Sequence, residues 1–292
     1  MRLRAAVKWC GFGLGGLLGI GILAIVACYA LVEIELRRTF PLSEHGLEIP
    51  GDEASIAEGQ RLARLRGCYG GCHGDGVNGR LNFALPDGTR LYAPDLARAA
   101  RERTPAEFAT IVRRGVRPDG TGVINMPSEM FQDLSDEDLG KILAYLLSQP
   151  AAPQKFPTRR IGPIARLVAV TLDAGVDGLL PAKRIDQQRA AVLRTPTDEL
   201  ELGRYLGHTV CSECHGVDLR GEEVFGGLFN PNLAIAAAYS PDAFRTLMRT
   251  GQSLSGRDLE LMDDVAIRRF SSFTDREIRA LHAYLKTLPA SR

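Results

Sequence analysis

The chain begins with one long apolar stretch, and the rest alternates short amphipathic segments with polar turns. Residues 9–32 contain no charged side chain over 24 positions. A helix of that length, at about 1.5 Å per residue, reaches across the ~30 Å hydrocarbon core of a bilayer. Arg2, Arg4 and Lys8 precede the stretch, and the positive-inside rule then keeps residues 1–8 in the cytoplasm and exports the remainder. We therefore predict a transmembrane helix at 9–32.

Two other fates of this N-terminal stretch stay open. A cleaved signal peptide has an apolar region of only about 7–15 residues and a small-residue cleavage site, whereas this stretch is longer and has no such site. The sequence Ile-Val-Ala-Cys ending at Cys28 resembles a lipoprotein box, although apolar residues continue beyond it. The length favours an uncleaved anchor.

Three glycines of the apolar stretch lie on one helix face. Gly11, Gly15 and Gly19 recur every four residues, a spacing that lets a partner transmembrane helix approach closely. A glycine-rich span without a partner helix explains the spacing equally well.

The exported part of the chain repeats itself. Residues 131–150 align with residues 270–289 over twenty positions without a gap, and both contain Ala-Tyr-Leu and end in proline. Each copy predicts a helix with a hydroxyl N-cap, an acidic residue three positions later, and apolar residues at i, i+3 and i+7. The capping pairs are Ser135 with Asp138 and Thr274 with Glu277.

A second helix matches upstream in both copies. The sequences begin at Thr104-Pro105 and Ser240-Pro241, which are cap-and-proline starts, and end at Gly115 and Gly251. We predict an all-α fold with two copies of one helical unit in tandem. The predicted organisation is 1–8 cytoplasmic, 9–32 transmembrane, 33–50 linker, 51–150 first domain, 151–196 linker and 197–290 second domain.

The linker 151–196 contains five prolines, which is typical of irregular chain. Its segment 161–172 is apolar but too short to span a membrane. We expect this segment to pack as a strand against its own domains, with a position on the bilayer as the alternative.

Charge and cysteine usage narrow the function. The net charge is +1, with 36 basic and 35 acidic residues, so a nucleic-acid binder, which is normally clearly basic, is not expected. Six cysteines are present. Cys10 and Cys28 lie in the apolar stretch, and the other four form two close pairs, each followed directly by histidine.

The second pair forms the attachment signature of c-type haem. Cys211, Cys214 and His215 read C-x-x-C-H. Two thiols at this spacing reach the two vinyl groups of one porphyrin, and the next residue points an imidazole at the iron. Zinc is the alternative, but it normally needs a further Cys or His at suitable spacing, and this copy offers no second cysteine pair.

The first pair is a variant of the same signature. Cys68 and Cys72 are separated by one residue more than usual, and His73 follows. Gly70 and Gly71 tolerate the unusual backbone angles that absorb the extra length. A disulfide or a metal site is the alternative.

With these motifs, both copies resemble the small helical domains of class I cytochromes c: helix, C-x(2–3)-C-H-G, proline, helix, methionine loop, and a last helix containing Ala-Tyr-Leu. The resemblance implies two covalently bound haem c groups with His73 and His215 as axial ligands. It also implies that the carbonyls of Pro94 and Pro231 hold those imidazoles by hydrogen bonds to the ring nitrogen.

Spacing selects the second axial ligands. Met126 lies 11 residues after Gly115, and Met262 lies 11 residues after Gly251. Met130 is the competing candidate and is expected to be a packing residue. We predict Met126 opposite the histidine of the first copy and Met262 opposite that of the second.

Iron held by histidine and methionine has no free coordination position, so electron transfer is expected and no catalytic residue is assigned. Tandem domains behind an anchor resemble dihaem cytochromes that serve dehydrogenases or respiratory oxidases. Redox proteins are the expected partners, with a dehydrogenase, a quinol-oxidising complex or a terminal oxidase as donor or acceptor. No small-molecule substrate is expected, and the expected location is the periplasmic side of a bacterial inner membrane.

Three enzyme or sensor classes compete with the carrier. A dihaem peroxidase needs one displaceable axial ligand, and the methionine in each copy speaks against it. A thiosulfate-oxidising enzyme uses a cysteine ligand, and no cysteine remains outside the motifs and the apolar stretch. A haem-based gas sensor would carry a signalling domain, which this sequence does not show.

Overall fold

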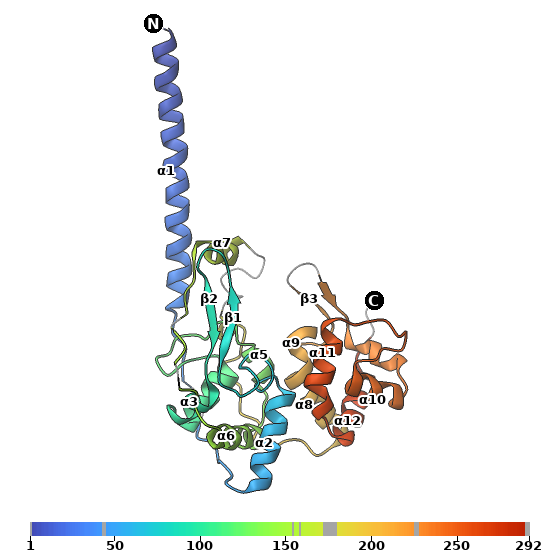
Figure 1. Cartoon of the computed structure of the whole chain (residues 1–292). Coiled ribbons are helices and arrows are strands. Elements are labelled where there is room, and N and C mark those ends of the chain that lie inside the picture. Colours follow the sequence, from blue (N-terminus) through green and yellow to red (C-terminus); the bar gives the residue numbers. More distant parts are fainter. Residues whose placement is uncertain are drawn as a thin grey trace.

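The computed structural model describes residues 2–42, 45–153, 155–157, 159–171, 180–224 and 228–289. One long helix, α1 (Arg2–Leu36), projects away from the rest of the chain (Figure 1). Within it, Phe12–Leu36 is long and apolar enough to cross a membrane, with a mean hydropathy of 2.4. Its large apolar side chains are almost all exposed, which fits either a membrane anchor or a signal sequence.

The residues before the linker, here called the first half (51–150), are mostly helical. Their elements, in order, are α2 (Glu53–Leu65), β1 (Arg80–Ala84), β2 (Arg90–Ala93), α3 (Leu96–Arg101), α4 (Pro105–Ala109), η1 (Thr110–Arg114), α5 (Ser128–Phe131) and α6 (Asp136–Ser148). The linker contributes α7 (Pro163–Thr171) and η3 (Pro181–Lys183).

The residues after the linker, here called the second half (197–290), repeat this order. The elements are α8 (Glu199–Leu206), η4 (Gly207–Cys211), α9 (Ser212–His215), β3 (Glu222–Val224), β4 (Leu228–Asn230), η5 (Leu233–Ala238), α10 (Pro241–Thr250), α11 (Leu261–Arg268), η6 (Phe270–Ser272) and α12 (Asp275–Leu285). Each half therefore has a helix before its cysteine motif, a hairpin after it, and a long last helix.

The first and last helices of each half cross at a glycine. A Cβ on Gly59 of α2 would lie 2.0 Å from the carbonyl oxygen of Lys141 in α6, and a Cβ on Gly203 of α8 would lie 2.0 Å from the carbonyl oxygen of Ala280 in α12. Only glycine allows the two backbones to approach this closely. Sequence reasoning had not singled out either glycine.

The all-α prediction is incomplete, because each half also contains a short hairpin. Strands β1 and β2 pair antiparallel, as do β3 and β4. Each hairpin follows the histidine of a cysteine motif and returns the chain to Pro94 or Pro231. Both hairpins are local in the chain, but their strands are too short to show a reliable alternation of apolar and polar residues, so periodicity gave no signal.

Helix starts and ends follow the local signals. Thr274 and Glu277 form a reciprocal capping box at α12. At α6 the Ser135 hydroxyl accepts from the amide of Asp138, but the Asp138 carboxylate turns away from the helix start and bonds elsewhere. Gly115 and Gly251 end their helices in the left-handed region, with φ of 65° and 80°.

The two halves share one apolar core. Leu62, Leu143 and Phe131 of the first half belong to the same buried cluster as Leu206 and Leu281 of the second. Helix α5 contacts η4 and α9, so the chain around the second cysteine motif packs directly on the first half.

The linker differs from its prediction as a strand. Pro163–Thr171 forms helix α7, which packs against the base of α1 (Figure 1). The buried Ala169 of α7 lies against Val32 and Leu36. An Asp87 carboxylate accepts from the amides of Ile164 and Ala165, and this cap from a distant hairpin supports the helix start. Leu172 lies outside the described residues.

Candidate functional site

The histidine of each cysteine motif is held by a proline carbonyl. Nδ1 of His73 donates to the carbonyl of Pro94 at 2.8 Å, and Nδ1 of His215 donates to the carbonyl of Pro231 at 2.8 Å. A carbonyl only accepts, so Nδ1 carries the proton and Nε2 keeps its lone pair. Both imidazoles are therefore presented as neutral ligands through Nε2.

Burial keeps these imidazoles neutral. Desolvation lowers the pKa of His73 and of His215 below the usual value, and the hydrogen bond to the proline carbonyl opposes the shift in each case. The neutral ring is the form that binds a metal. At both sites desolvation outweighs the hydrogen bond, so the net shift of the pKa favours the neutral ring.

The turn that follows each motif histidine closes with the same backbone hydrogen bond in both halves. The amide of Gly79 donates to the carbonyl of His73 at 2.9 Å, and the amide of Gly221 donates to that of His215 at 3.0 Å. Both glycines take positive φ, 82° and 98°. Each loop thereby brings its proline under its histidine.

Two buried apolar residues in these loops occupy the left-handed region. Val77 and Leu219, each four positions after the motif histidine, have φ of 53° and 61° and no exposed surface. Such angles are strained for branched or bulky residues and persist only where packing fixes them. Sequence reasoning missed both residues, although their equal spacing from His73 and His215 was a usable signal.

The four cysteine sulfurs are unlinked thiols in the structure. Burial raises the pKa of the Cys68 thiol to about 11 and that of the Cys211 thiol to about 12, and it raises those of Cys72 and Cys214 as well. These sites favour a neutral sulfur over a thiolate. Among the described residues, no three His, Cys, Asp or Glu side chains gather in a way that could hold a metal ion.

The extra residue of the first motif is absorbed by glycine. Gly70 has φ of 72°, and a Cβ on Gly71 would lie 2.3 Å from the carbonyl oxygen of Gly67. The two glycines therefore do what the sequence suggested. The second motif, by contrast, is helical throughout η4 and α9.

The methionines differ in burial. Met130 is 3% exposed and sits inside the core, as expected of a packing residue. Met126 and Met262 are half-buried and pack against the edge of the same core. Met126 lies in a loop directly after Asn125, which has φ of 60°, whereas Met262 is in the first turn of α11.

Arg269 contacts the chain beside both cysteine motifs. Its Nη1 donates to the carboxylate of Glu213 at 2.8 Å, and its Nε donates to the carbonyl of Leu65 at 3.3 Å. Glu213 lies between Cys211 and Cys214, and Leu65 ends the helix that leads to the first motif. One cation thus joins the two candidate sites.

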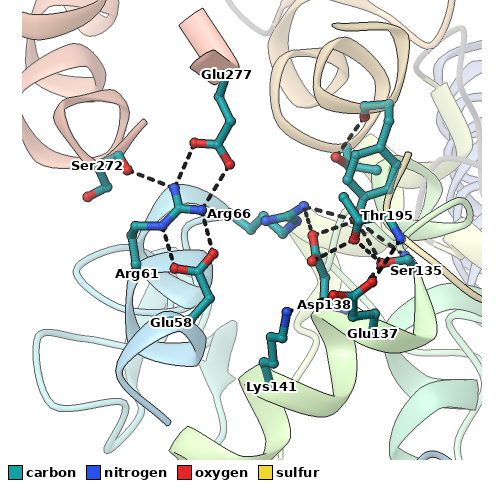
Figure 2. Close-up of polar contacts among 12 residues, drawn as sticks. Glu58, Arg61, Arg66, Ser135, Glu137, Asp138, Lys141, Thr195, Ser272 and Glu277 are labelled. Carbon is teal, nitrogen blue, oxygen red and sulfur yellow. Dashed lines mark hydrogen bonds and ion pairs between the residues drawn. The ribbon is translucent and has the colours of Figure 1, made fainter. Parts of the chain in front are cut away.

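A buried polar network lies at the same interface (Figure 2). Arg66 has no exposed side-chain surface and donates to Asp138 at 2.8 Å and to the hydroxyl of Tyr205 at 3.1 Å. The Tyr205 hydroxyl in turn donates to Asp138 at 2.7 Å, and Thr195 donates to the same carboxylate at 2.7 Å. The bonds of Tyr205 to Arg66 and Asp138 cross between the halves, and that of Thr195 comes from the linker, so the network fixes their relative position.

A second ion pair crosses the interface nearby. Arg61 of α2 donates to Glu277 of α12 at 2.8 Å and to the carbonyl of Ser272 at 2.9 Å, while Glu58 accepts from the same guanidinium (Figure 2). Glu277 also completes the capping box of α12, so the pair ties the start of that helix to α2.

The remaining histidines have structural roles. His282 is almost fully buried, bonds the carbonyl of Ala236 at 3.1 Å and stacks on Phe244. His208 is half-buried and bonds the hydroxyl of Tyr284 at 3.2 Å. Met248 is buried in the core.

The donor set fits a haem c at each site. A neutral imidazole with Nε2 available, two unlinked thiols on the preceding turn and a half-buried methionine are present in both halves. Thioether formation needs two reduced, closely spaced cysteine thiols, and iron in such a site takes nitrogen and thioether sulfur. The residues that would hold the group are those that the sequence motifs named.

The apolar stretch carries no visible partner for its glycine face. A Cβ on Gly15 or Gly19 would meet nothing within 4 Å. Gly11 is in the same helix, and its side-chain surroundings lie outside those described. The glycine face stays a prediction about a partner helix.

Comparison with known families identifies the first half. Residues 54–146 match the family described as cytochrome c oxidase, cbb3-type, subunit III. They therefore form a cytochrome c domain, and such a domain implies haem c. The match covers α2 to α6, with Cys68, Cys72, His73 and Met126 inside it.

Comparison with curated proteins extends over both halves. The chain is 27% identical over 278 residues to the cytochrome c subunit of a quinone-dependent alcohol dehydrogenase from Gluconobacter oxydans (strain 621H), which covers 82% of this chain and 56% of that protein. It is 24% identical over 264 residues to the fructose dehydrogenase cytochrome subunit of Gluconobacter japonicus, covering 81% and 53%. The chain thus spans just over half the length of these relatives.

The first half is a cytochrome c domain by its family match. Its hydrogen-bonded histidine and its pair of thiols fit that assignment. The likeness to the two subunits is distant but covers more than four fifths of the chain. The chain therefore contains a cytochrome c domain and is distantly similar, over most of its length, to cytochrome c subunits of dehydrogenases.

Proposed function

We propose that this chain is a membrane-anchored dihaem cytochrome c that relays electrons from a dehydrogenase on the periplasmic side of a bacterial inner membrane. The observation that carries the proposal is the repeated pair of 2.8 Å hydrogen bonds from a motif histidine to a proline carbonyl. The second pair lies outside the family match and supports a second haem site of the same kind.

In this proposal each residue type has one task. His73 and His215 bind iron through Nε2, because the proline carbonyls take the Nδ1 protons. Met126 and Met262 fill the opposite positions and leave none free for a substrate. Haem c would supply a one-electron couple at each site, with a potential raised by the thioether ligand.

Interface residues would keep the two sites at a fixed separation. Tyr205 of the second half forms buried bonds to Arg66 and Asp138 of the first, and Arg269 touches the chain beside both motifs. A rigid connection suits a relay, since the distance between two redox centres must not fluctuate. Independent domains on a flexible linker would leave these polar groups unpaired.

The similarity to dehydrogenase subunits supports a dehydrogenase as the electron donor. The similar proteins are subunits of alcohol and fructose dehydrogenases, so a dehydrogenase is the proposed donor. The match of residues 54–146 to a cbb3-type oxidase subunit family favours a second candidate, delivery of electrons to a terminal oxidase. In both cases the partners are redox proteins and α1 keeps the chain at the membrane.

The decisive experiment uses the full-length protein solubilised gently from its membrane. Co-purifying subunits are identified, and the cytochrome is mixed with its dehydrogenase and that enzyme's substrate. We expect reduction of both haems within one catalytic cycle of the dehydrogenase. Reduction of neither haem, together with rapid peroxide turnover by the reduced protein, would instead identify a dihaem peroxidase.

A further inference from the structure

Helix α7 is amphipathic in the opposite sense to an ordinary surface helix. Its large apolar side chains point outward: Ile164 and Leu167 are 47% and 56% exposed. Its inward face carries the small Ala169 and the half-buried Ala165. A surface helix of a water-soluble protein buries its large apolar residues and exposes polar ones. The outward face of α7 therefore fits an apolar environment.

The outward face of α7 (Pro163–Thr171) presents no unpaired polar side chain to its surroundings. Val168 and Val170 continue the exposed apolar surface. The only hydroxyl there belongs to Thr171, and it donates to the carbonyl of Leu167 at 2.9 Å within the helix itself. Contact with hydrocarbon would leave no unsatisfied side chain on this face.

Helix α7 lies where the candidate membrane span meets the first half (Figure 1). Its Ala169 packs against Val32 and Leu36 at the end of α1. Arg166 donates to Glu33 at 3.2 Å and lies over the ring of Tyr29, 4.6 Å from its centroid. The apolar face of α7 is thus continuous with the exposed apolar surface of α1.

The helix is also fixed to the first half. The carboxylate of Asp87 accepts from the amides at its start, and the Thr89 hydroxyl accepts from the amide of Gly162 at 2.9 Å. Arg90 and Arg160 exchange backbone hydrogen bonds of 2.8 and 2.9 Å. Because of these bonds, the hairpin that follows the first cysteine motif keeps a fixed position relative to α7.

We propose that α7 is an interfacial helix whose outward face lies in the outer leaflet of the membrane that α1 spans, and that it fixes the orientation of the first haem site over that membrane. The occupant of the face is lipid, because the surface is continuous with the span. At nine residues, or about 13 Å, the helix is too short to cross the bilayer and long enough to lie in its surface. The inference rests on the proposed anchoring of the chain by α1.

Site-directed spin labelling of the full-length holoprotein in nanodiscs tests the proposal. Cys10→Ser and Cys28→Ser remove the thiols that are not in haem motifs. A nitroxide is then placed by Leu167→Cys, Ile164→Cys, or, as controls, Leu23→Cys in the span and Ile235→Cys on the second half. Power saturation compares collisions with oxygen, which partitions into lipid, and with a water-soluble nickel chelate.

We expect labels at Leu167 and Ile164 to favour oxygen over the chelate, as the Leu23 label does, and the Ile235 label to favour the chelate. Free access of the chelate to Leu167 would overturn the proposal. Exclusion of both reagents would also overturn it, because a protein subunit would then cover the face. If α1 does not span the membrane, the chelate will reach the label at Leu23, which separates that failure from failure of the α7 proposal. If the haems are not attached, the free cysteines of the haem motifs will also take up the label.

Discussion

Arg269 forms an ion pair of 2.8 Å with Glu213, which lies inside the second cysteine motif. Arg269 also donates to the carbonyl of Leu65, and a Cβ on Gly67 would lie 3.0 Å from its guanidinium carbon. The second half thus places a mostly buried cation against the chain that leads into the first motif. The stability of the interface should depend on this residue.

Replacing this cation should loosen the interface. Arg269→Met leaves the Glu213 carboxylate without its partner, so we expect the free energy of unfolding to fall by about 1–3 kcal/mol. Denaturant titration followed by circular dichroism measures the change. The matched control is Arg268→Met, which breaks the exposed pair with Asp264 and should cost well under about 1 kcal/mol. Equal effects of the two variants would contradict the assigned role.

The glycines at the helix crossings should tolerate no side chain. Gly59→Ala and Gly203→Ala each push a methyl group onto a backbone carbonyl, and we expect a loss of about 1–3 kcal/mol despite the better helix propensity of alanine. Gly51→Ala is the control, because a Cβ there meets nothing within 4 Å, and it should change stability by no more than about 0.5 kcal/mol. Thermal or chemical unfolding distinguishes the two sets.

The number of haems should be two, one for each cysteine pair. The double variant Cys68→Ala/Cys72→Ala should retain one covalent haem, and so should Cys211→Ala/Cys214→Ala. Denatured protein, extracted with acid solvent and then assayed for haem by absorbance and intact mass, gives the count. One haem on the unaltered chain would show that Cys68 and Cys72 do not attach a haem.

Met126 and Met130 should respond in opposite ways to truncation. Met126→Ala should leave the first haem attached but without its sulfur ligand, and its reduction potential should fall. Met130→Ala should keep the potential and lower the free energy of unfolding by about 2–5 kcal/mol, because this side chain is buried in the core. Redox titration and denaturation of both variants test the pair of expectations. A potential that drops in Met130→Ala would mean that the loop register inferred from the repeat is wrong.

The interface should weaken at alkaline pH through Tyr205. Desolvation and the nearby Asp138 raise the pKa of its hydroxyl above the ordinary value. The folded state therefore keeps a proton that the unfolded state loses above about pH 10, so stability is full below that pH and falls as pH rises. Tyr205→Phe removes this dependence while also losing the bond to Asp138. Unfolding measured from pH 8 to 11 should give a smaller slope for the variant than for the unaltered chain.

Local signals were read correctly from the sequence. The capping box of Thr274 with Glu277 was correct, because it joins residues three positions apart and backbone geometry alone determines the contact. The resemblance to cytochrome c domains pointed to Pro231 as the partner of His215, and the carbonyl of Pro231 lies 2.8 Å from Nδ1 of that histidine. The roles of Cys211, Cys214 and His215 in holding a haem stay predictions.

The sequence by itself determined the apolar helix, the repeat and the two cysteine motifs, because these depend on periodicity and short spacing; the proline partners came from the resemblance to cytochrome c domains. Only the tertiary structure decided which charged residues far apart in the chain pair with one another. Asp138 looked like half of a capping box, yet its carboxylate accepts from Arg66, Thr195 and Tyr205. The segment after Pro163 looked like a strand and became a helix, because Asp87 caps it and Ala169 packs on α1. These outcomes depend on which surfaces meet after folding, and a linear pattern carries no record of that.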